Sequence, residues 1–219
     1  MRFLGGMVQL RSEHGSYYEY DPSISLIDED AWGKYYRGVC RNASESREVR
    51  IYELNANFHL PEYTLRRLRV ESHICYSHPN IIPVIDFIVS FDEHQANDCR
   101  LFFVEEYFSG ISLSNLLDEQ IKDSKELYSI FQSDRTTFAR KITKDILQGL
   151  LLFHERGLCI RYIDTDSIII TDDGVVKIPI KNCFIYDIMS YIRSDGITST
   201  GLKTLISSLP VSYLSPEMI

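Results

Sequence analysis

The sequence predicts an α+β fold of two lobes, in which a half rich in β-strands precedes a helical half. Residues 7–54 and 80–108 carry short runs of alternating apolar and polar side chains, which are typical of strands. After Ser109 and Gly110 the apolar residues recur at spacings of three and four, which predicts helices. We therefore expect five strands and one helix first, then a helical half, with a hinge near residues 108–112.

The composition fits a globular protein, with 44% hydrophobic and 25% charged residues in a chain of 219. The net charge of -8 argues against a nucleic-acid-binding surface, which needs clustered lysine and arginine. Five scattered cysteines without a CxxC pair form neither a disulfide framework nor a zinc site, so we expect a reducing, cytoplasmic location. We also expect no membrane segment, because no window reaches ~18 uninterrupted apolar residues, and no signal peptide.

The first strands are expected to form a hairpin over MVQLRSEHGSYYEYD (7–21), which turns at residues 14–16. A second pair is predicted around ISLI (24–27) and KYYRGVC (34–40), followed by REVRIYEL (47–54). Side chains alternate along a strand, so Arg50 and Tyr52 should lie on one face and Val49 and Ile51 on the other.

The rest of the strand-rich half begins with a helix over PEYTLRRLRVESHICY (61–76), where a proline suits the first turn. Two more strands are predicted over NIIPVIDFIVSF (80–91) and RLFFVEEYF (100–108). In the helical half, SLSNLLDEQI (112–121) starts with a serine cap, and the helix TTFARKITKDILQGLLLFHERG (136–157) ends at a glycine.

The segment GLCIRYIDTDSIIITDDGVVKI (157–178) combines a helix end, a polar turn and a β-hairpin. The apolar triplet at residues 168–170 and the turn Asp172-Asp173-Gly174 fix its register, because a slip of one residue would reverse which side chains face inward.

In sequence order, HPNIIPVIDFI, LFFVEEYFSGISLSNLL, the segment above and YLSPEMI follow one another as they do in eukaryotic-type protein kinases. The chain resembles that family from about Ile27 to Ile219. The resemblance implies an N-terminal extension or hairpin (1–25), a kinase-like N-lobe of five strands and one helix (26–108) and a partial helical C-lobe (109–219). Because Ser215-Pro216-Glu217 looks like the family's Ala-Pro-Glu element, we expect a truncated lobe or a piece of a longer protein.

The resemblance also implies a nucleotide cleft beneath the N-lobe, but the matching residues are degenerate. Kinases cover the phosphates with three spaced glycines and hold them with a strand lysine. Here Asp28 and Asp30 stand in place of the first two glycines, and only Gly33 remains. Tyr52 replaces the lysine, and Arg50 replaces the alanine beside the adenine.

Three further positions extend this degeneration. Tyr35 stands where the family usually has valine, and Arg69 falls where a helix glutamate should hold the lysine. Glu105 occupies the gatekeeper position before the hinge, where a buried acid needs a partner or a proton. We expect Arg50 to be that partner, so that the pair would fill the cleft from within.

The catalytic positions are replaced as well. In the register fixed above, Tyr162 stands at the catalytic base, Ser167 at the metal-binding asparagine and Ile180 at the principal magnesium ligand. Asp164 and Asp166 are alternative carboxylates, but bringing either to the position of the base needs a slip of two or four residues. We interpret both as turn residues.

These replacements favour a catalytically inactive pseudokinase, which is a kinase-like scaffold or regulator that does not bind Mg-ATP productively. Its expected partner is a protein, such as an active kinase or the rest of a longer chain. One alternative is an atypical serine/threonine kinase that retains ATP and Mg and uses Asp164 or Asp166. Another is a diverged remnant, or a fragment whose activity depends on a missing part.

Overall fold

The computed structural model describes residues 1–4, 6–29, 33–41, 46–54, 66, 78–91, 99–118, 134–157, 160 and 163–181. The helix predicted over 61–76 lies outside this set apart from Arg66, and so does the Ser215-Pro216-Glu217 element. The chain divides into two compact units. The first holds the described residues of Met1–Ile74 and Val84–Tyr107, and the second holds those of Cys75–Pro83 and Phe108–Met189.

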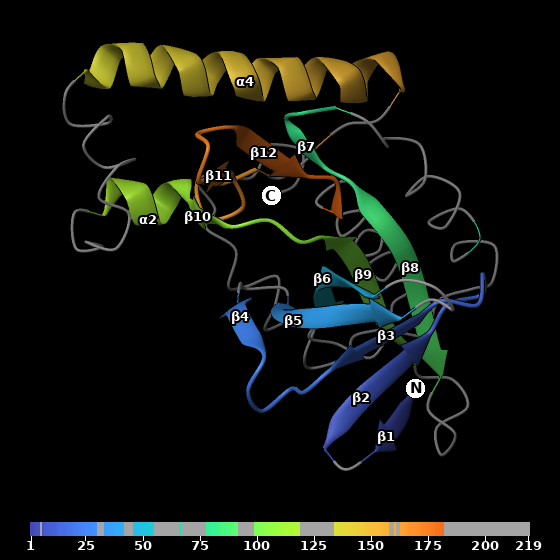
Figure 1. Cartoon of the computed structure of the whole chain (residues 1–219). Coiled ribbons are helices and arrows are strands. Elements are labelled where there is room, and N and C mark those ends of the chain that lie inside the picture. Colours follow the sequence, from blue (N-terminus) through green and yellow to red (C-terminus); the bar gives the residue numbers. More distant parts are fainter. Residues whose placement is uncertain are drawn as a thin grey trace, which may run out of the picture. The chain divides into compact units, whose positions relative to one another are not determined.

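The first unit is built on a curled antiparallel sheet of eight strands, in the order β1-β2-β3-β5-β6-β9-β8, with β4 also paired to β5 (Figure 1). Its strands are β1 (Arg2–Leu4), β2 (Met7–Arg11), β3 (Tyr17–Tyr20), β4 (Leu26–Glu29), β5 (Gly33–Arg41), β6 (Ser46–Leu54), β8 (Val84–Phe91) and β9 (Cys99–Glu106).

The five strands expected over residues 26–108 form in this sheet as β4, β5, β6, β8 and β9. The predicted hairpin forms as β2 and β3 and turns at Gly15, whose φ is 87°. The hairpin is continuous with the sheet, because β3 pairs with β5 along the same edge as β4. Strands β1, β2 and β3 extend this sheet, and β3 and β4 follow each other along one edge of β5, separated by the loop at residues 21–25.

The N-terminal hairpin supplies part of the core of this unit. Val8 and Leu10 of β2 are at most 2% exposed and pack with Val49 and Ile51 of β6. Burying four such aliphatic side chains contributes about 1.5–3 kcal/mol each relative to full exposure. The hairpin is therefore an integral part of the sheet.

The run at residues 80–91 forms two strands, where the sequence suggested one. Ile81–Ile82 is β7 of the second unit and Val84–Phe91 is β8 of the first. Pro83 lies between them and has no N–H group to donate to a ladder, which accounts for the break.

The described part of the second unit combines a four-stranded sheet, in the order β10-β11-β12-β7, with the helices α2 and α4 (Figure 1). Its other elements are β10 (Gly110–Ser112), α2 (Leu113–Leu117), α4 (Arg135–Glu155), β11 (Ile169–Thr171) and β12 (Val176–Pro179). The predicted serine cap is confirmed, since the Ser112 side chain accepts from the Asn115 N–H at 3.1 Å. The predicted end of the long helix is confirmed at Gly157, which has a φ of 71°.

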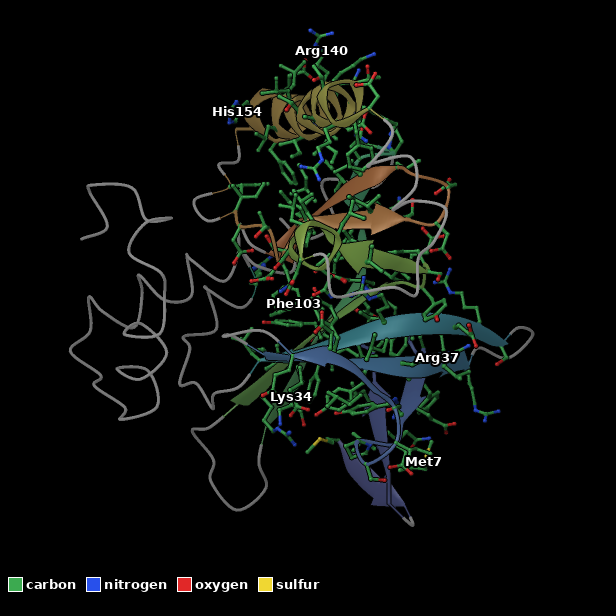
Figure 2. The ribbon with its side chains drawn as sticks, turned by 90° about the vertical axis from the view of Figure 1, so that its left-hand side faces the viewer. Met7, Lys34, Arg37, Phe103, Arg140 and His154 are labelled. Atoms are coloured by element: carbon green, nitrogen blue, oxygen red, sulfur yellow. The ribbon has the colours of Figure 1, made fainter. Side chains whose placement is uncertain are left out.

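Helix α4 packs on this sheet through Phe138 and Ile142, which share a buried cluster with Ile170 and Val176. Gly149 allows a close approach, because a Cβ there would lie 3.0 Å from Ile178 and 3.1 Å from the Asn80 carbonyl oxygen. Figure 2 shows Arg140 on the side of α4 that points away from the sheet and His154 at the flank of the helix. No helix in the described part of the chain is long and apolar enough to cross a membrane.

Candidate functional site

The strand alternation predicted for β6 is confirmed. Val49 and Ile51 point into the core that the N-terminal hairpin shares. Arg50 and Tyr52 point to the opposite face, where both contact the ring of Tyr35. The kinase resemblance predicts that this face lines the nucleotide cleft, and we call it the candidate face.

An aromatic row crosses the candidate face on four neighbouring strands. Tyr35 lies opposite Tyr52, Tyr52 opposite Phe103, and Phe103 opposite Phe87. Their ring centroids are 4.6, 6.4 and 5.0 Å apart in that order, within or near the range of favourable aromatic pairs. All four side chains are at most 6% exposed. The candidate face is therefore lined by a continuous row of the protein's own buried aromatic rings.

The glycine that remains from the phosphate-covering loop is packed against this row. A Cβ added to Gly33 would lie 2.6 Å from Cζ and 2.8 Å from the hydroxyl oxygen of Tyr52, and 2.3 Å from the Glu53 carbonyl oxygen. Kinase glycines let the backbone approach phosphates. Here the space beside the glycine is occupied by the ring that stands in place of the lysine.

A charged pair lies next to the aromatic row. Arg50 and Glu105 are directly opposed in the β6–β9 register, so their side chains leave the same face at neighbouring positions. Arg50 is 5% exposed and Glu105 is 0% exposed. The guanidinium carbon of Arg50 also lies 4.3 Å from the centroid of the Tyr35 ring, within cation–π range. The register supports the expected pairing, and a direct ion pair between the two groups stays a prediction.

The other positions predicted for the cleft are placed as follows. Asp28 lies on the exposed strand β4, opposite Tyr35 of β5, and its carboxylate accepts from the Glu29 N–H at 2.9 Å. Asp30 and Arg69 lie outside the described residues.

Of the predicted catalytic positions, Ser167 lies in a closed turn with Asp164. The Ser167 N–H donates to the Asp164 carboxylate at 2.7 Å, and the Ser167 hydroxyl donates to the Asp164 carbonyl at 3.0 Å. These contacts form the local turn that aspartate and serine side chains favour. Asp166 is exposed in the same turn. The geometry therefore supports the interpretation of both aspartates as turn residues.

The position that matches the magnesium ligand is apolar and inaccessible. Ile180 follows β12 and is 0% exposed, and a hydrocarbon side chain offers no oxygen to a hard cation. The next residue, Lys181, is 1% exposed. Tyr162 lies outside the described residues. In the part of the chain that the structure describes, no group of three His, Cys, Asp or Glu residues could hold a metal ion.

Two members of the aromatic row, Phe103 and Phe87, were not identified from the sequence. Phe103 precedes Glu105 by two residues, so strand alternation alone would have placed it on the candidate face. Phe87 gave no such signal, because its position depends on the pairing of β8 with β9. Figure 2 shows Phe103 on the side of β5 and β6 away from the hairpin that carries Met7.

Comparison with known proteins identifies protein kinases that are distantly similar in sequence. No family model matches the chain. The chain is 26% identical over 162 residues to the MAP kinase-interacting serine/threonine-protein kinase mnk-1 of Caenorhabditis elegans (72% of this chain, 20% of that protein). It is 29% identical over 134 residues to the serine/threonine-protein kinase PksC of Streptomyces coelicolor (60% of this chain, 22% of that protein). The chain thus spans about a fifth of the length of these two relatives.

The solved structures show the fold. The chain matches the PknI kinase domain of Mycobacterium tuberculosis with a TM-score of 0.53 and 16% sequence identity, over 83% of this chain and 64% of that one. The fold predicted from the sequence is therefore confirmed at the level of a kinase-like α+β architecture.

Proposed function

We propose that this chain, which is a protein kinase-like domain by fold and distant sequence similarity, is a pseudokinase. It acts as a protein-binding scaffold or regulator and does not bind Mg-ATP productively. The observation that carries the proposal is the position of Tyr52. Its ring replaces the phosphate-holding lysine, fills the space beside Gly33 and continues the aromatic row.

The residues present do not fit Mg-ATP. Tyr52 offers no positive charge to a phosphate, unlike the lysine that it replaces. Ile180 offers no metal ligand, and the Ser167 hydroxyl is engaged in the turn with Asp164. Phosphoryl transfer depends on positioning and on charge neutralisation by just these groups. Loss of the general base alone costs a factor of ~10²–10⁴ in rate.

A thermal-shift titration with ATP and Mg²⁺ tests the nucleotide part of the proposal. We expect the melting temperature of the wild-type chain to stay constant, because ligand binding to the folded state would raise it by mass action. A shift of several degrees that requires both ATP and Mg²⁺ would overturn the proposal. It would favour the atypical kinase, and a phosphotransfer assay on the Asp164→Asn and Asp166→Asn variants would then identify the base.

A variant with smaller side chains and a lysine on the candidate face, called the opened variant, tests whether nucleotide binding can be gained. Tyr52→Lys combined with Arg50→Ala and Tyr35→Val restores the family's residues at three positions on the candidate face. We expect this variant to gain a nucleotide-dependent shift over its own baseline, while a Tyr20→Phe control, which removes a hydroxyl from the opposite side of the sheet, gains none. If the wild type and the opened variant bind ATP equally, the aromatic row does not exclude nucleotide.

A further inference from the structure

We infer that the outer edge of β4 is a docking site for an extended peptide in which basic residues precede apolar ones, and that this peptide joins the sheet as an added strand. The inference names a class of partner for the protein-binding role proposed above and rests on that role. It depends on the pairing, exposure and charge of residues 21–29.

Strand β4 has an uncovered edge. Among the described residues β4 pairs only with β5, whereas β3, which lies along the same side of β5, is covered by β2. All four residues of β4 are exposed, so no other described part of the chain covers their side chains. Proteins commonly protect such edges, because an open edge accepts further strands.

The backbone of β4 is oriented for strand addition. The Arg37 N–H donates to the Ser25 carbonyl at 2.8 Å, so Ser25 bonds toward β5. Backbone groups alternate between the two sides of an antiparallel strand, and in β4 this alternation holds up to the register shift between Leu26 and Asp28. The N–H and C=O of Leu26, the next residue, therefore point to the outer edge, where a peptide could bond to them.

The loop before β4 is held in one conformation by Asp21. Its carboxylate accepts from the Ser23 N–H at 2.9 Å and from the Ser23 hydroxyl at 2.5 Å, and its carbonyl accepts from the Ser25 N–H at 2.9 Å. These hydrogen bonds from Ser23 hold the pKa of Asp21 below its ordinary value. A preformed edge reduces the entropy that binding must overcome.

The exposed side chains define the chemistry of the peptide. Ile24, Leu26 and Ile27 are 83%, 48% and 46% exposed, so three apolar side chains lie open within four residues. Asp28 and Glu29 follow them and are also exposed. A strand that pairs antiparallel, as every pair in this sheet does, would place its first residues beside the acids and its later residues beside the apolar side chains. Basic residues followed by apolar ones are therefore complementary.

The acidic end is accessible to an incoming cation. Glu29 is paired with Lys34 at 3.6 Å, and the two side chains are 50% and 40% exposed. Exposed pairs of this kind contribute little to stability, so a lysine or arginine of the peptide can replace Lys34 at small cost.

Fluorescence anisotropy with a labelled peptide tests the site directly. The probe is Lys-Thr-Lys-Thr-Val-Thr-Val-Thr, titrated with the whole chain at low salt. A second peptide carries aspartate in place of both lysines, and a third carries proline in place of two threonines, which removes backbone donors. We expect the first peptide to bind, and each of the other two to bind about tenfold more weakly or worse.

Substitutions locate the binding. Leu26→Lys introduces a charge on the edge without removing a buried group, and should weaken binding of the first peptide about tenfold. The matched control is Leu147→Lys on α4, which changes a leucine that is 58% exposed and should leave affinity within about twofold. Amide exchange should slow at Leu26 when the peptide binds, because its outward N–H becomes bonded.

Three results would overturn the inference: no binding of the first peptide, equal binding of the proline peptide, or equal losses from Leu26→Lys and Leu147→Lys. A wild-type dimer that Leu26→Lys dissociates would also overturn it, by assigning the edge to a second copy of the chain. The nucleotide titration is read separately. If the chain binds neither Mg-ATP nor the first peptide, only the edge site is refuted. If the chain binds both, only the pseudokinase assignment is refuted.

Discussion

The phenol of Tyr18 donates a hydrogen bond of 3.0 Å to the carboxylate of Asp86, and both side chains are buried. Tyr18 lies on β3 and Asp86 on β8, and the sheet order places β5, β6 and β9 between them. A direct bond between strands so far apart in the order requires a strongly curled sheet. The bond therefore ties the N-terminal hairpin to the far end of the same sheet.

Tyr18→Phe should lower the free energy of unfolding by about 1–3 kcal/mol, because it leaves a buried carboxylate without this donor. Urea unfolding measures the change. Tyr17→Phe is the control, since Tyr17 is adjacent but more exposed, with its ring 5.6 Å from the Arg11 guanidinium carbon. Equal decreases in the free energy of unfolding of the two variants would show that the Tyr18 hydroxyl does not stabilise the curled sheet.

Stability should fall at alkaline pH. Burial raises the pKa of Tyr18 and of Tyr20 above the ordinary value of 10.0, and the nearby Asp86 carboxylate raises that of Tyr18 further. A group whose pKa is higher in the folded state stabilises the fold fully below the unfolded value, and this contribution is lost as pH rises above it. The melting temperature should therefore decline above about pH 10.

The variant Tyr18→Phe/Tyr20→Phe identifies the groups responsible for this pH dependence. Measured against its own melting temperature at pH 8, the variant should decline less steeply above pH 10 than the wild type. Parallel declines would assign the alkaline loss to other groups.

A double-mutant cycle on Arg50→Ala and Glu105→Leu should reveal coupling on the candidate face. Removal of Arg50 alone takes the neighbouring positive charge away from the Glu105 carboxylate, which is 0% exposed, and this destabilises the fold. Removal of both side chains leaves no buried carboxylate at this position and avoids that loss of stability. We expect a coupling of about 1 kcal/mol or more in unfolding experiments.

The exposed pair Arg37–Glu48, with a contact of 2.6 Å, gives the comparison cycle and should show a weaker coupling. If the effects of Arg50→Ala and Glu105→Leu simply add, the two buried residues do not act as a pair.

The turn assignment makes opposite predictions for two neighbouring aspartates. Asp164→Ala should destabilise the second unit by about 1 kcal/mol, because the Ser167 N–H loses its acceptor. Asp166→Ala should be close to neutral, since that side chain is exposed. Thermal unfolding of both variants measures the difference. A larger loss from Asp166→Ala would contradict the turn assignment.

Local rules predicted the candidate face better than they predicted the sheet that carries it. Arg50 and Tyr52 were placed on one face because alternation along a strand is a short-range property of the backbone. The same rule applied to Glu105 would have added Phe103. The joining of β3 to β5 and the position of Phe87 depend on which strands pair over long sequence distances, and periodicity carries no information about that choice.

The break at Pro83 limits how the chain can be divided. Ile81 and Ile82 pair in parallel with Ile178 and Pro179 of β12, although they precede β8 and β9 of the other unit in sequence. Asn80 adds a bond from its side-chain amide to the Val176 carbonyl at 2.9 Å. A protein expressed from residue 108 onward would lack β7, and β12 would expose an apolar edge in its place. The second unit therefore has to be produced together with β7, which β8 and β9 of the first sheet separate from it in sequence.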